Sequence, residues 1–419
     1  MKVLKMRLAA VFLQHLQKPS NNLSKTSRLA FVPRLHFHSG SALRQQSGTH
    51  IKKGQLKLQE SHLELNDYFP EPVQFWHIWL RDHCQCDLCY NHTTHQRNLN
   101  ILTVPSDIKP QNCWISNDQL LVEWADKHLS KFSLEWLYKN NYNTHYQKLK
   151  DQKPVLWNNT VNLLDDAVDA TAYLEDENYV KKVLQSLARF GVGFVKNVPA
   201  TVDATEKVVT RISHVQRTMF GDMWVLDDRM VHSDTAYTKQ SLCAHTDNTY
   251  FTEPAGLQVF HCLHHDGEGG RTLLVDGFRA AEDVKKTHPE SYRRLCTTPV
   301  EFRYLEKGRH YSFTGPILSL NAVTKDIEHI RFNLLDRAPF SSVPTAEVKQ
   351  FYEDIRILAS EISKPEGEMW IKLSPGLVLF IDNWRVLHGR EAFSGYRKLT
   401  GCYIGRSDFL SKARVLGVL

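Results

Sequence analysis

The chain has 419 residues, of which 42% are hydrophobic, and its formal net charge is +6. Eleven lysines and arginines, and no acidic residue, lie in residues 1–59, so the remainder of the chain is net acidic. The length allows a large buried core and two domains, and the acidic remainder argues against nucleic acid as a partner of the folded part. No apolar run reaches the roughly 20 residues that a membrane-spanning helix needs, so we expect no membrane association.

Residues 1–50 are basic, rich in serine, asparagine and glutamine, and free of acidic side chains. Leu4, Leu8, Phe12 and Leu16 recur every four residues and would form one apolar face of a helix beside basic residues. This pattern is typical of a mitochondrial transit peptide and predicts a location in the mitochondrial matrix. The alternative is a basic, disordered N-terminus without a targeting role.

Residues 55–150 predict a small, β-rich N-terminal domain that contains a cysteine cluster, Cys84-x-Cys86-x-x-Cys89. Three thiolates at this spacing favour a tetrahedral metal ion, zinc above all, and they need a fourth ligand. The other cysteines are scattered, which argues against a disulfide framework. Three histidines are candidates for the fourth ligand: His92 and His95 close by, and His128 further along the chain.

Beyond a polar connector at residues 150–170, the pattern predicts helices and then many strands. One helix is expected over residues 176–190, ended by Gly191, and another over residues 204–220, with Gly221 at its C-cap. Amphipathic helices that flank many strands indicate an α+β fold. The expected strands are residues 192–195, 256–263, 272–275, 376–381 and 399–404.

His245 and Asp247 form a His-x-Asp motif in a segment that we expect to be extended. Residues two apart in a strand point to the same face, so both side chains could bind one metal ion. A second histidine, His388, would complete a set of two histidines and one carboxylate. That set leaves coordination positions open and is typical of non-haem Fe(II) oxygenases. These three residues are therefore the predicted iron ligands and catalytic centre.

Oxygenases of this kind that use 2-oxoglutarate need a fixed cation for its distal carboxylate. Arg397 lies nine residues after His388, where the next strand could bring it beside the metal, and its planar guanidinium suits a carboxylate. Thr272 is the predicted second donor. His261, His264 and His265 are rejected as a metal site, because they lie on or just after a core strand.

Several runs of the chain, from about residue 60 to the end, resemble the 2-oxoglutarate dioxygenases of carnitine biosynthesis, the trimethyllysine and γ-butyrobetaine dioxygenases. The resemblance covers the iron motifs and the cysteine cluster and is carried by long, specific runs. They are Trp79–Cys84, Asp234–Lys239, Gln258–Cys262, Arg271–Phe278 and Phe380–Arg390.

The resemblance implies a double-stranded β-helix, or jelly-roll, catalytic core over residues 165–419. It also implies Fe(II), 2-oxoglutarate as cosubstrate with O2, ascorbate and a homodimer. For the N-terminal site it implies a structural zinc ion with His128 as the fourth ligand beside Cys84, Cys86 and Cys89. The complete cysteine set departs from some trimethyllysine dioxygenases, which lack the middle cysteine.

The resemblance further implies a pocket for a quaternary ammonium, which cannot donate hydrogen bonds and is therefore recognised by aromatic faces. Asp234 stands where the butyrobetaine enzymes have asparagine, and a carboxylate suits the additional α-ammonium of trimethyllysine. Asn333 could accompany it by accepting from or donating to the amino-acid head. The alternative role of Asp234 is to cap a helix or turn before Thr235. The aromatic cage would be formed by Phe220, in place of the usual tyrosine, with Trp224, Tyr237 and Tyr403.

The predicted reaction is hydroxylation of free Nε-trimethyllysine at C3, the first step of carnitine biosynthesis, with 2-oxoglutarate converted to succinate and CO2. One alternative is γ-butyrobetaine hydroxylation, the last step of the same pathway. A lesser one is hydroxylation or demethylation of methyl-lysine in proteins. The substrate expected is thus a small quaternary-ammonium amino acid.

Overall fold

The computed structural model describes residues 54–419, except 143, 145–146, 149–152 and 228–234. The predicted transit peptide and Asp234 therefore lie outside the described residues. Within them, no helix is long and apolar enough to cross a lipid bilayer.

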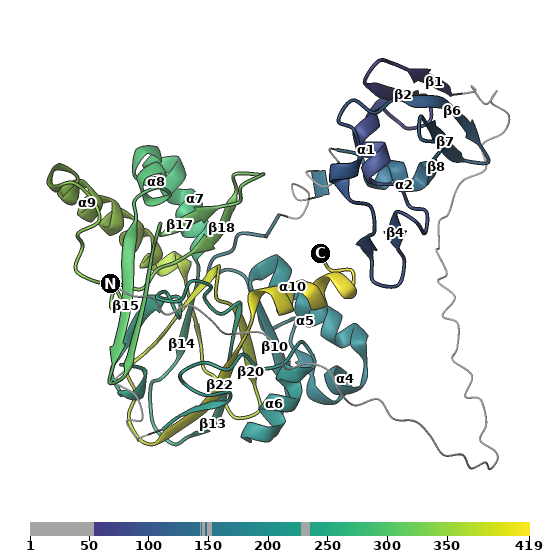
Figure 1. Cartoon of the computed structure of the whole chain (residues 1–419). Helices are drawn as coiled ribbons and strands as arrows, with labels where there is room; N and C mark the ends of the chain where they lie inside the picture. Colours follow the sequence, from purple (N-terminus) through teal and green to yellow (C-terminus); the bar gives the residue numbers. More distant parts are fainter. Residues whose placement is uncertain (1–53, 143, 145–146, 149–152, 228–234) are drawn as a thin grey trace, which may run out of the picture. The chain divides into compact units, whose positions relative to one another are not determined.

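The N-terminal part is β-rich and contains two antiparallel three-stranded sheets (Figure 1). Along their strands buried and more exposed residues alternate, as in Leu63 and Leu65 or Leu120 and Val122, so one face of each sheet enters a shared core around Trp124. The elements are β1 (Gln55–Leu58), β2 (His62–Asn66), β3 (Val73–Trp76), α1 (His77–Asp82), β4 (Tyr90–Asn91), β5 (Gln96–Arg97), η1 (Ile101–Thr103), β6 (Pro110–Ser116), β7 (Gln119–Trp124), β8 (Leu129–Ser133) and α2 (Leu134–Lys139).

The C-terminal part, from β9 onwards, is built on a six-stranded and a four-stranded sheet. The larger has the order β11-β22-β13-β20-β10-β9 and the smaller the order β12-β21-β14-β19. The larger sheet comprises β9 (Val168–Asp169), β10 (Val192–Lys196), β11 (Trp224–Leu226), β13 (Leu257–His265), β20 (Val378–Asp382) and β22 (Arg397–Ile404), and the smaller β12 (Leu242–His245), β14 (Thr272–Asp276), β19 (Glu368–Ile371) and β21 (Val386–Arg390).

The strands β14, β20 and β21 are buried on both faces, and alternate residues enter different cores. On β20, Leu379 and Ile381 enter a core that also receives Leu274 and Val386 of the smaller sheet, so the two sheets share this core. Phe380 points the other way, into a core with the helices α4 (Ala170–Glu175), α5 (Glu177–Phe190), α6 (Val202–Thr210) and α10 (Arg406–Val415). Figure 1 shows these helices beside β10, β20, β22 and β13.

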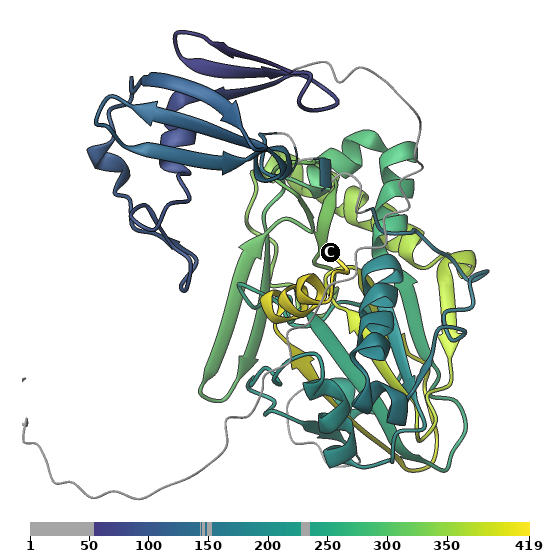
Figure 2. The same ribbon diagram turned by 90° about the vertical axis from the view of Figure 1, so that its right-hand side faces the viewer.

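The smaller sheet has a third core on its other face, where Leu273 and Val275 of β14 pack against helices. Figure 2 shows the nearby pair β15–β16 (green) as a long two-stranded ribbon. The elements here are α7 (Gly277–Thr287), α8 (Pro289–Leu295), β15 (Val300–Glu306), β16 (Arg309–Gly315), β17 (Leu318–Leu320), β18 (Ile327–Ile330), α9 (Thr345–Ile362) and η3 (Pro365–Gly367).

A buried ion pair joins the segment before the first helices to the sheets. Arg385 Nη2 lies 2.8 Å from Asp276 Oδ2, and both side chains are almost fully buried. The same guanidinium donates to the carbonyls of Val155 and Arg189, and Asp276 accepts from the backbone N–H of Trp157. Partners satisfy both charges, which a buried ion pair requires.

The first predicted helix is found as α5, and Gly191 ends it in the left-handed conformation at φ 77°. The second prediction is wrong in length, because α6 ends at Thr210. Beyond it, Gln216 N donates to Tyr403 O and Thr218 pairs with Gly221 in a tight turn, so Gly221 does not cap this helix. The apolar residues at helical spacing thus continue into a loop.

Candidate active site

The strand register places the two predicted histidine ligands opposite each other. β12 and β21 are antiparallel neighbours, and His245 is the register partner of His388. Their ring centroids lie 4.4 Å apart. Residues directly opposite on neighbouring strands project from the same face of a sheet, so two residues far apart in the chain present their imidazoles together.

Asp247 adds the carboxylate two residues after His245. Its Oδ1 lies 3.3 Å from His245 Nε2 and 3.6 Å from His388 Nε2. Metal–ligand bonds of roughly 2.1 Å at right angles separate neighbouring ligand atoms by about 3 Å. The three donor atoms therefore fit one ion bound on one face, with further coordination positions open.

Hydrogen bonds fix the orientation of these ligands. His245 Nδ1 donates to the carbonyl of Cys243 at 2.8 Å, which leaves Nε2 with the lone pair that a metal needs. Asn383 accepts from the backbone N–H of Asp247 at 2.8 Å and donates to its carbonyl at 3.0 Å. Within the described chain His388 Nδ1 is buried without a hydrogen-bond partner.

The electrostatics favour a neutral His388 beside an ionised Asp247. Burial and the neighbouring His245 lower the pKa of His388 to about 3. Burial alone would raise the pKa of Asp247, but the two histidines and the hydroxyl of Tyr403 outweigh it and lower that pKa. Burial likewise opposes protonation of His245, whereas Asp247 raises its pKa overall. A neutral imidazole and a carboxylate are the forms that bind metal ions.

The three side chains line a cavity of about 430 Å³. Arg397, at the start of β22, and Thr272, at the start of β14, also line it. Arg397 is 5% exposed and forms no ion pair with any described carboxylate. Burial lowers the pKa of Arg397 to about 10, so it remains a cation at neutral pH. Its Nη2 donates to the carbonyl of Gly270 at 3.5 Å, and a buried guanidinium in a cavity wall without a carboxylate partner among the described residues is suited to the carboxylate of a ligand.

All four predicted aromatic residues line the same cavity. Trp224 and Tyr403 pack against each other with ring centroids 6.2 Å apart, and Trp224 meets Phe260 edge to face at 5.5 Å. Phe220 contacts Tyr304 edge to face at 6.1 Å. The structure thus places the four aromatic residues in the wall of the cavity that the three candidate metal ligands also line.

Asn333 also lines the cavity, but its side chain is engaged within the protein. Its Nδ2 donates to Asp336 Oδ2 at 2.8 Å and its Oδ1 accepts from Leu335 N at 2.9 Å. Asp336 is a further carboxylate of the cavity wall, which the sequence did not predict. Only the structure reveals it, because nothing in its sequence context distinguishes it from a surface aspartate.

The rejected histidines stay outside the candidate metal sets of the described chain. His261 is buried and hydrogen-bonded to Thr205 and Gly376. His264 and His265 contact Asp266 and Lys372. Three other residues were missed as parts of the site: Asn383, Gln258 and Arg390, the last of which lines the cavity and donates to carbonyls of residues 236, 238 and 240.

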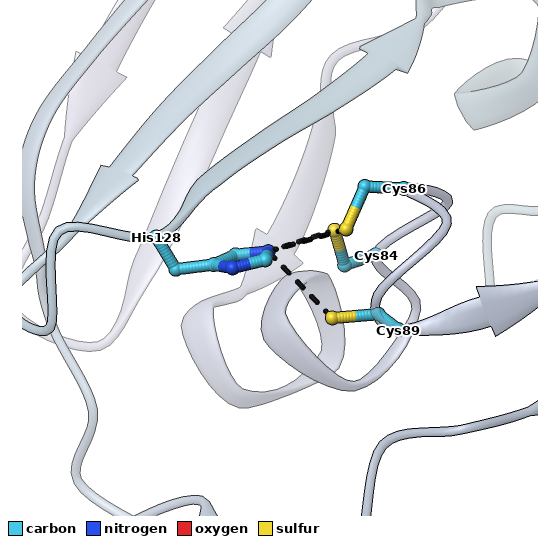
Figure 3. A group of neighbouring side chains, drawn as sticks. All are labelled: Cys84, Cys86, Cys89 and His128. Atoms are coloured by element: carbon cyan, nitrogen blue, oxygen red, sulfur yellow. Dashed lines mark hydrogen bonds between the residues drawn. The ribbon is translucent and has the colours of Figure 1, made fainter.

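In the N-terminal part, Cys84, Cys86, Cys89 and His128 converge, as Figure 3 shows. His128 Nε2 lies 3.2, 3.6 and 3.6 Å from the three sulfur atoms in that order. Tetrahedral zinc with bonds of roughly 2.3 Å to sulfur and 2.0 Å to nitrogen would separate these atoms by about 3.5 Å. The four residues therefore fit a closed zinc site.

The nearer histidines do not join this group. His92 instead bonds to the carbonyl of Gln85, and both His92 and His95 are exposed. His128 reaches the cysteines because the β7–β8 turn, with Lys127 at φ 64°, brings it beside them.

Two family models match the chain. Residues 145–403 match the taurine catabolism dioxygenase TauD, TfdA family, and residues 55–138 match the gamma-butyrobetaine hydroxylase-like N-terminal family.

Curated relatives match over most of the chain. It is 46% identical over 367 residues to the mitochondrial trimethyllysine dioxygenase of Rattus norvegicus and 45% identical over 365 residues to that of Homo sapiens, with 86% of each chain covered. It is 31% identical over 351 residues to the gamma-butyrobetaine dioxygenase of Pseudomonas sp. (strain AK-1), covering 82% of this chain and 90% of that one. The chain therefore belongs to the TauD, TfdA dioxygenase family, in the branch that contains the trimethyllysine dioxygenases.

Proposed function

We propose that this enzyme hydroxylates free Nε-trimethyllysine at C3 with Fe(II), 2-oxoglutarate and O2. The observation that carries the proposal is the convergence of His245, Asp247 and His388 in a cavity that Arg397 and the aromatic residues also line. The 46% identity to a trimethyllysine dioxygenase supports the choice of substrate.

In this proposal His245, Asp247 and His388 hold Fe(II), which together with 2-oxoglutarate and O2 supplies the oxidising chemistry. Arg397 pairs with the distal carboxylate of 2-oxoglutarate, and the Thr272 hydroxyl donates to it. The protein's own contribution is to fix the positions of both organic molecules and to exclude water from the cavity.

The trimethylammonium group would rest against the aromatic faces of Phe220, Trp224, Tyr237 and Tyr403, because it offers charge without hydrogen-bond donors. Asp234 remains the proposed partner of the α-ammonium, although it lies outside the described residues. The Asn333–Asp336 bond limits what Asn333 can offer, since one of its N–H groups is already engaged.

The proposal also covers the fold, the zinc site, the location and the oligomeric state. The two sheets would form the double-stranded β-helix of the family, over residues 165–419, with a separate zinc-binding domain over 55–150. Cys84, Cys86, Cys89 and His128 would bind structural zinc, since four protein ligands leave no open position. Residues 1–50 would direct the enzyme to the mitochondrial matrix, where it would act as a homodimer with ascorbate as a supporting reductant.

The test measures succinate and hydroxylated product with three substrates: trimethyllysine, γ-butyrobetaine and a peptide containing trimethyllysine. We expect turnover of the free amino acid to exceed that of the other two. The Asp234→Asn variant should lose this preference, because it removes the carboxylate proposed to bind the α-ammonium. Faster turnover of γ-butyrobetaine or of the peptide by the unaltered enzyme would contradict the proposal, and His388→Ala serves as the inactive control.

A further inference from the structure

The two carboxylate oxygens of Asp247 have different surroundings. Oδ1 faces the Nε2 atoms of both histidines. Oδ2 accepts two hydrogen bonds, one from Gln258 Nε2 at 2.5 Å and one from the Tyr403 hydroxyl at 2.8 Å. One oxygen is thus left for a metal ion and the other is held by the protein.

The two donors come from neighbouring strands at the same level. Gln258 on β13 and Tyr403 on β22 are direct register partners, so their side chains project together from the larger sheet. They are 2% and 5% exposed. Gln258 Oε1 has no hydrogen-bond partner in the described chain, so the only bond its side-chain amide makes there is to Asp247. Asp247, which follows β12 of the smaller sheet, is therefore oriented by two buried, neighbouring side chains of the larger sheet.

Tyr403 also takes part in the cavity wall. Its ring lines the cavity and packs against Trp224, while its hydroxyl reaches the carboxylate. A substitution to phenylalanine would keep the ring and remove only the hydroxyl. This allows the contribution to the metal site to be measured separately from the contribution to the cavity.

We propose that Gln258 and Tyr403 are positioning residues that hold Asp247 for one-oxygen coordination of the metal ion. With Oδ2 held by both donors, the carboxylate would present Oδ1 alone to a bound ion and would leave room beside it for 2-oxoglutarate. The proposal deepens the proposed function, since it rests on the iron site formed by His245, Asp247 and His388. Partners of this kind typically contribute 10- to 100-fold to metal affinity.

The experiment uses Mn(II) as a probe for Fe(II) and follows free Mn(II) by electron paramagnetic resonance in the full chain without substrate. Tyr403→Phe and Gln258→Met should each lower Mn(II) affinity roughly tenfold, while the melting temperature changes little. Tyr173→Phe, which removes a buried hydroxyl on α4 outside the cavity, is the matched control and should leave Mn(II) affinity unchanged.

A second measurement titrates 2-oxoglutarate into the Fe(II)-loaded protein without oxygen and follows the charge-transfer absorption of the complex. The apparent affinity for 2-oxoglutarate should also fall in Tyr403→Phe and Gln258→Met. Unchanged Mn(II) and 2-oxoglutarate affinities in both folded variants would overturn the inference and leave the proposed function intact. Failure of the unaltered protein to bind Mn(II) would instead overturn the iron site itself.

Discussion

The buried His261 should make the stability of the folded protein depend on pH. It lies on β13, fully buried, where Nε2 accepts from the backbone N–H of Gly376 at 3.1 Å and Nδ1 lies 2.7 Å from the Thr205 hydroxyl. The acceptor role of Nε2 requires a neutral ring with its proton on Nδ1. Burial lowers the pKa of His261 from 6.5 to about 4, so folding favours the unprotonated form.

Acidification should therefore destabilise the folded protein. The stabilisation is fully present above the unfolded pKa of about 6.5 and is lost as the pH falls from there towards about 4, because the unfolded chain binds a proton that the folded chain excludes. Between pH 7.5 and pH 5.5 this single group should lower the free energy of unfolding by about 1.3 kcal/mol, and the full displacement corresponds to ~3 kcal/mol.

The assay is urea unfolding of the unaltered protein and His261→Leu at both pH values. The variant should be less stable at pH 7.5 by about 1–3 kcal/mol, since the N–H of Gly376 loses its acceptor. Its loss of stability on acidification should be smaller than that of the unaltered protein by about 1.3 kcal/mol. His264→Leu, which removes an exposed histidine of the same strand, is the control. Equal pH dependence in His261→Leu and the unaltered protein would show that His261 is not the source of this loss of stability.

Two further predictions concern the ligand sites. Arg397→Lys should raise the KM for 2-oxoglutarate about tenfold or more with little effect on the KM for trimethyllysine, because a lysine cannot form the two parallel bonds of a guanidinium. The measurement is succinate formation at varied 2-oxoglutarate concentrations, and an unchanged KM for 2-oxoglutarate would contradict the prediction. Cys86→Ser should abolish zinc binding and lower the melting temperature of the N-terminal part, because metal binding contributes to folding. Elemental analysis measures the zinc content and thermal melts measure the stability. One zinc ion per chain in the variant would contradict the prediction.

Short-range sequence patterns correctly predicted a helix whose ends are set by nearby residues. The helix before Gly191 is found because its apolar spacing and left-handed terminator act within a few residues. The predicted helix over residues 204–220 is wrong beyond Thr210, since bonds to Tyr403 and within the following turn compete with the helical pattern. Apolar spacing alone cannot distinguish a buried loop from a further helical turn.

For the site, residue types and short spacings identified His245 and Asp247 as a pair, whereas their position opposite His388 depends on strand register. That register is set by which strands become neighbours, a property of the whole sheet. The same limit explains why Gln258 and Arg390 were missed: each acts on a residue that only the fold brings close. His128 rather than His92 lies beside the three cysteines because of the turn between β7 and β8, which is distant from the cysteines in sequence.

The hydrogen bonds of Arg385 and Asn383 to distant parts of the chain affect the order in which the enzyme can fold. Arg385 bonds to Val155 across 230 residues of sequence, and Asn383 clamps Asp247 across 136. A ribosome releases the chain from its N-terminus and delivers these partners almost last, and contacts so distant in sequence form slowly. The three candidate metal ligands can therefore come together only when the chain is available at least as far as His388, close to its end.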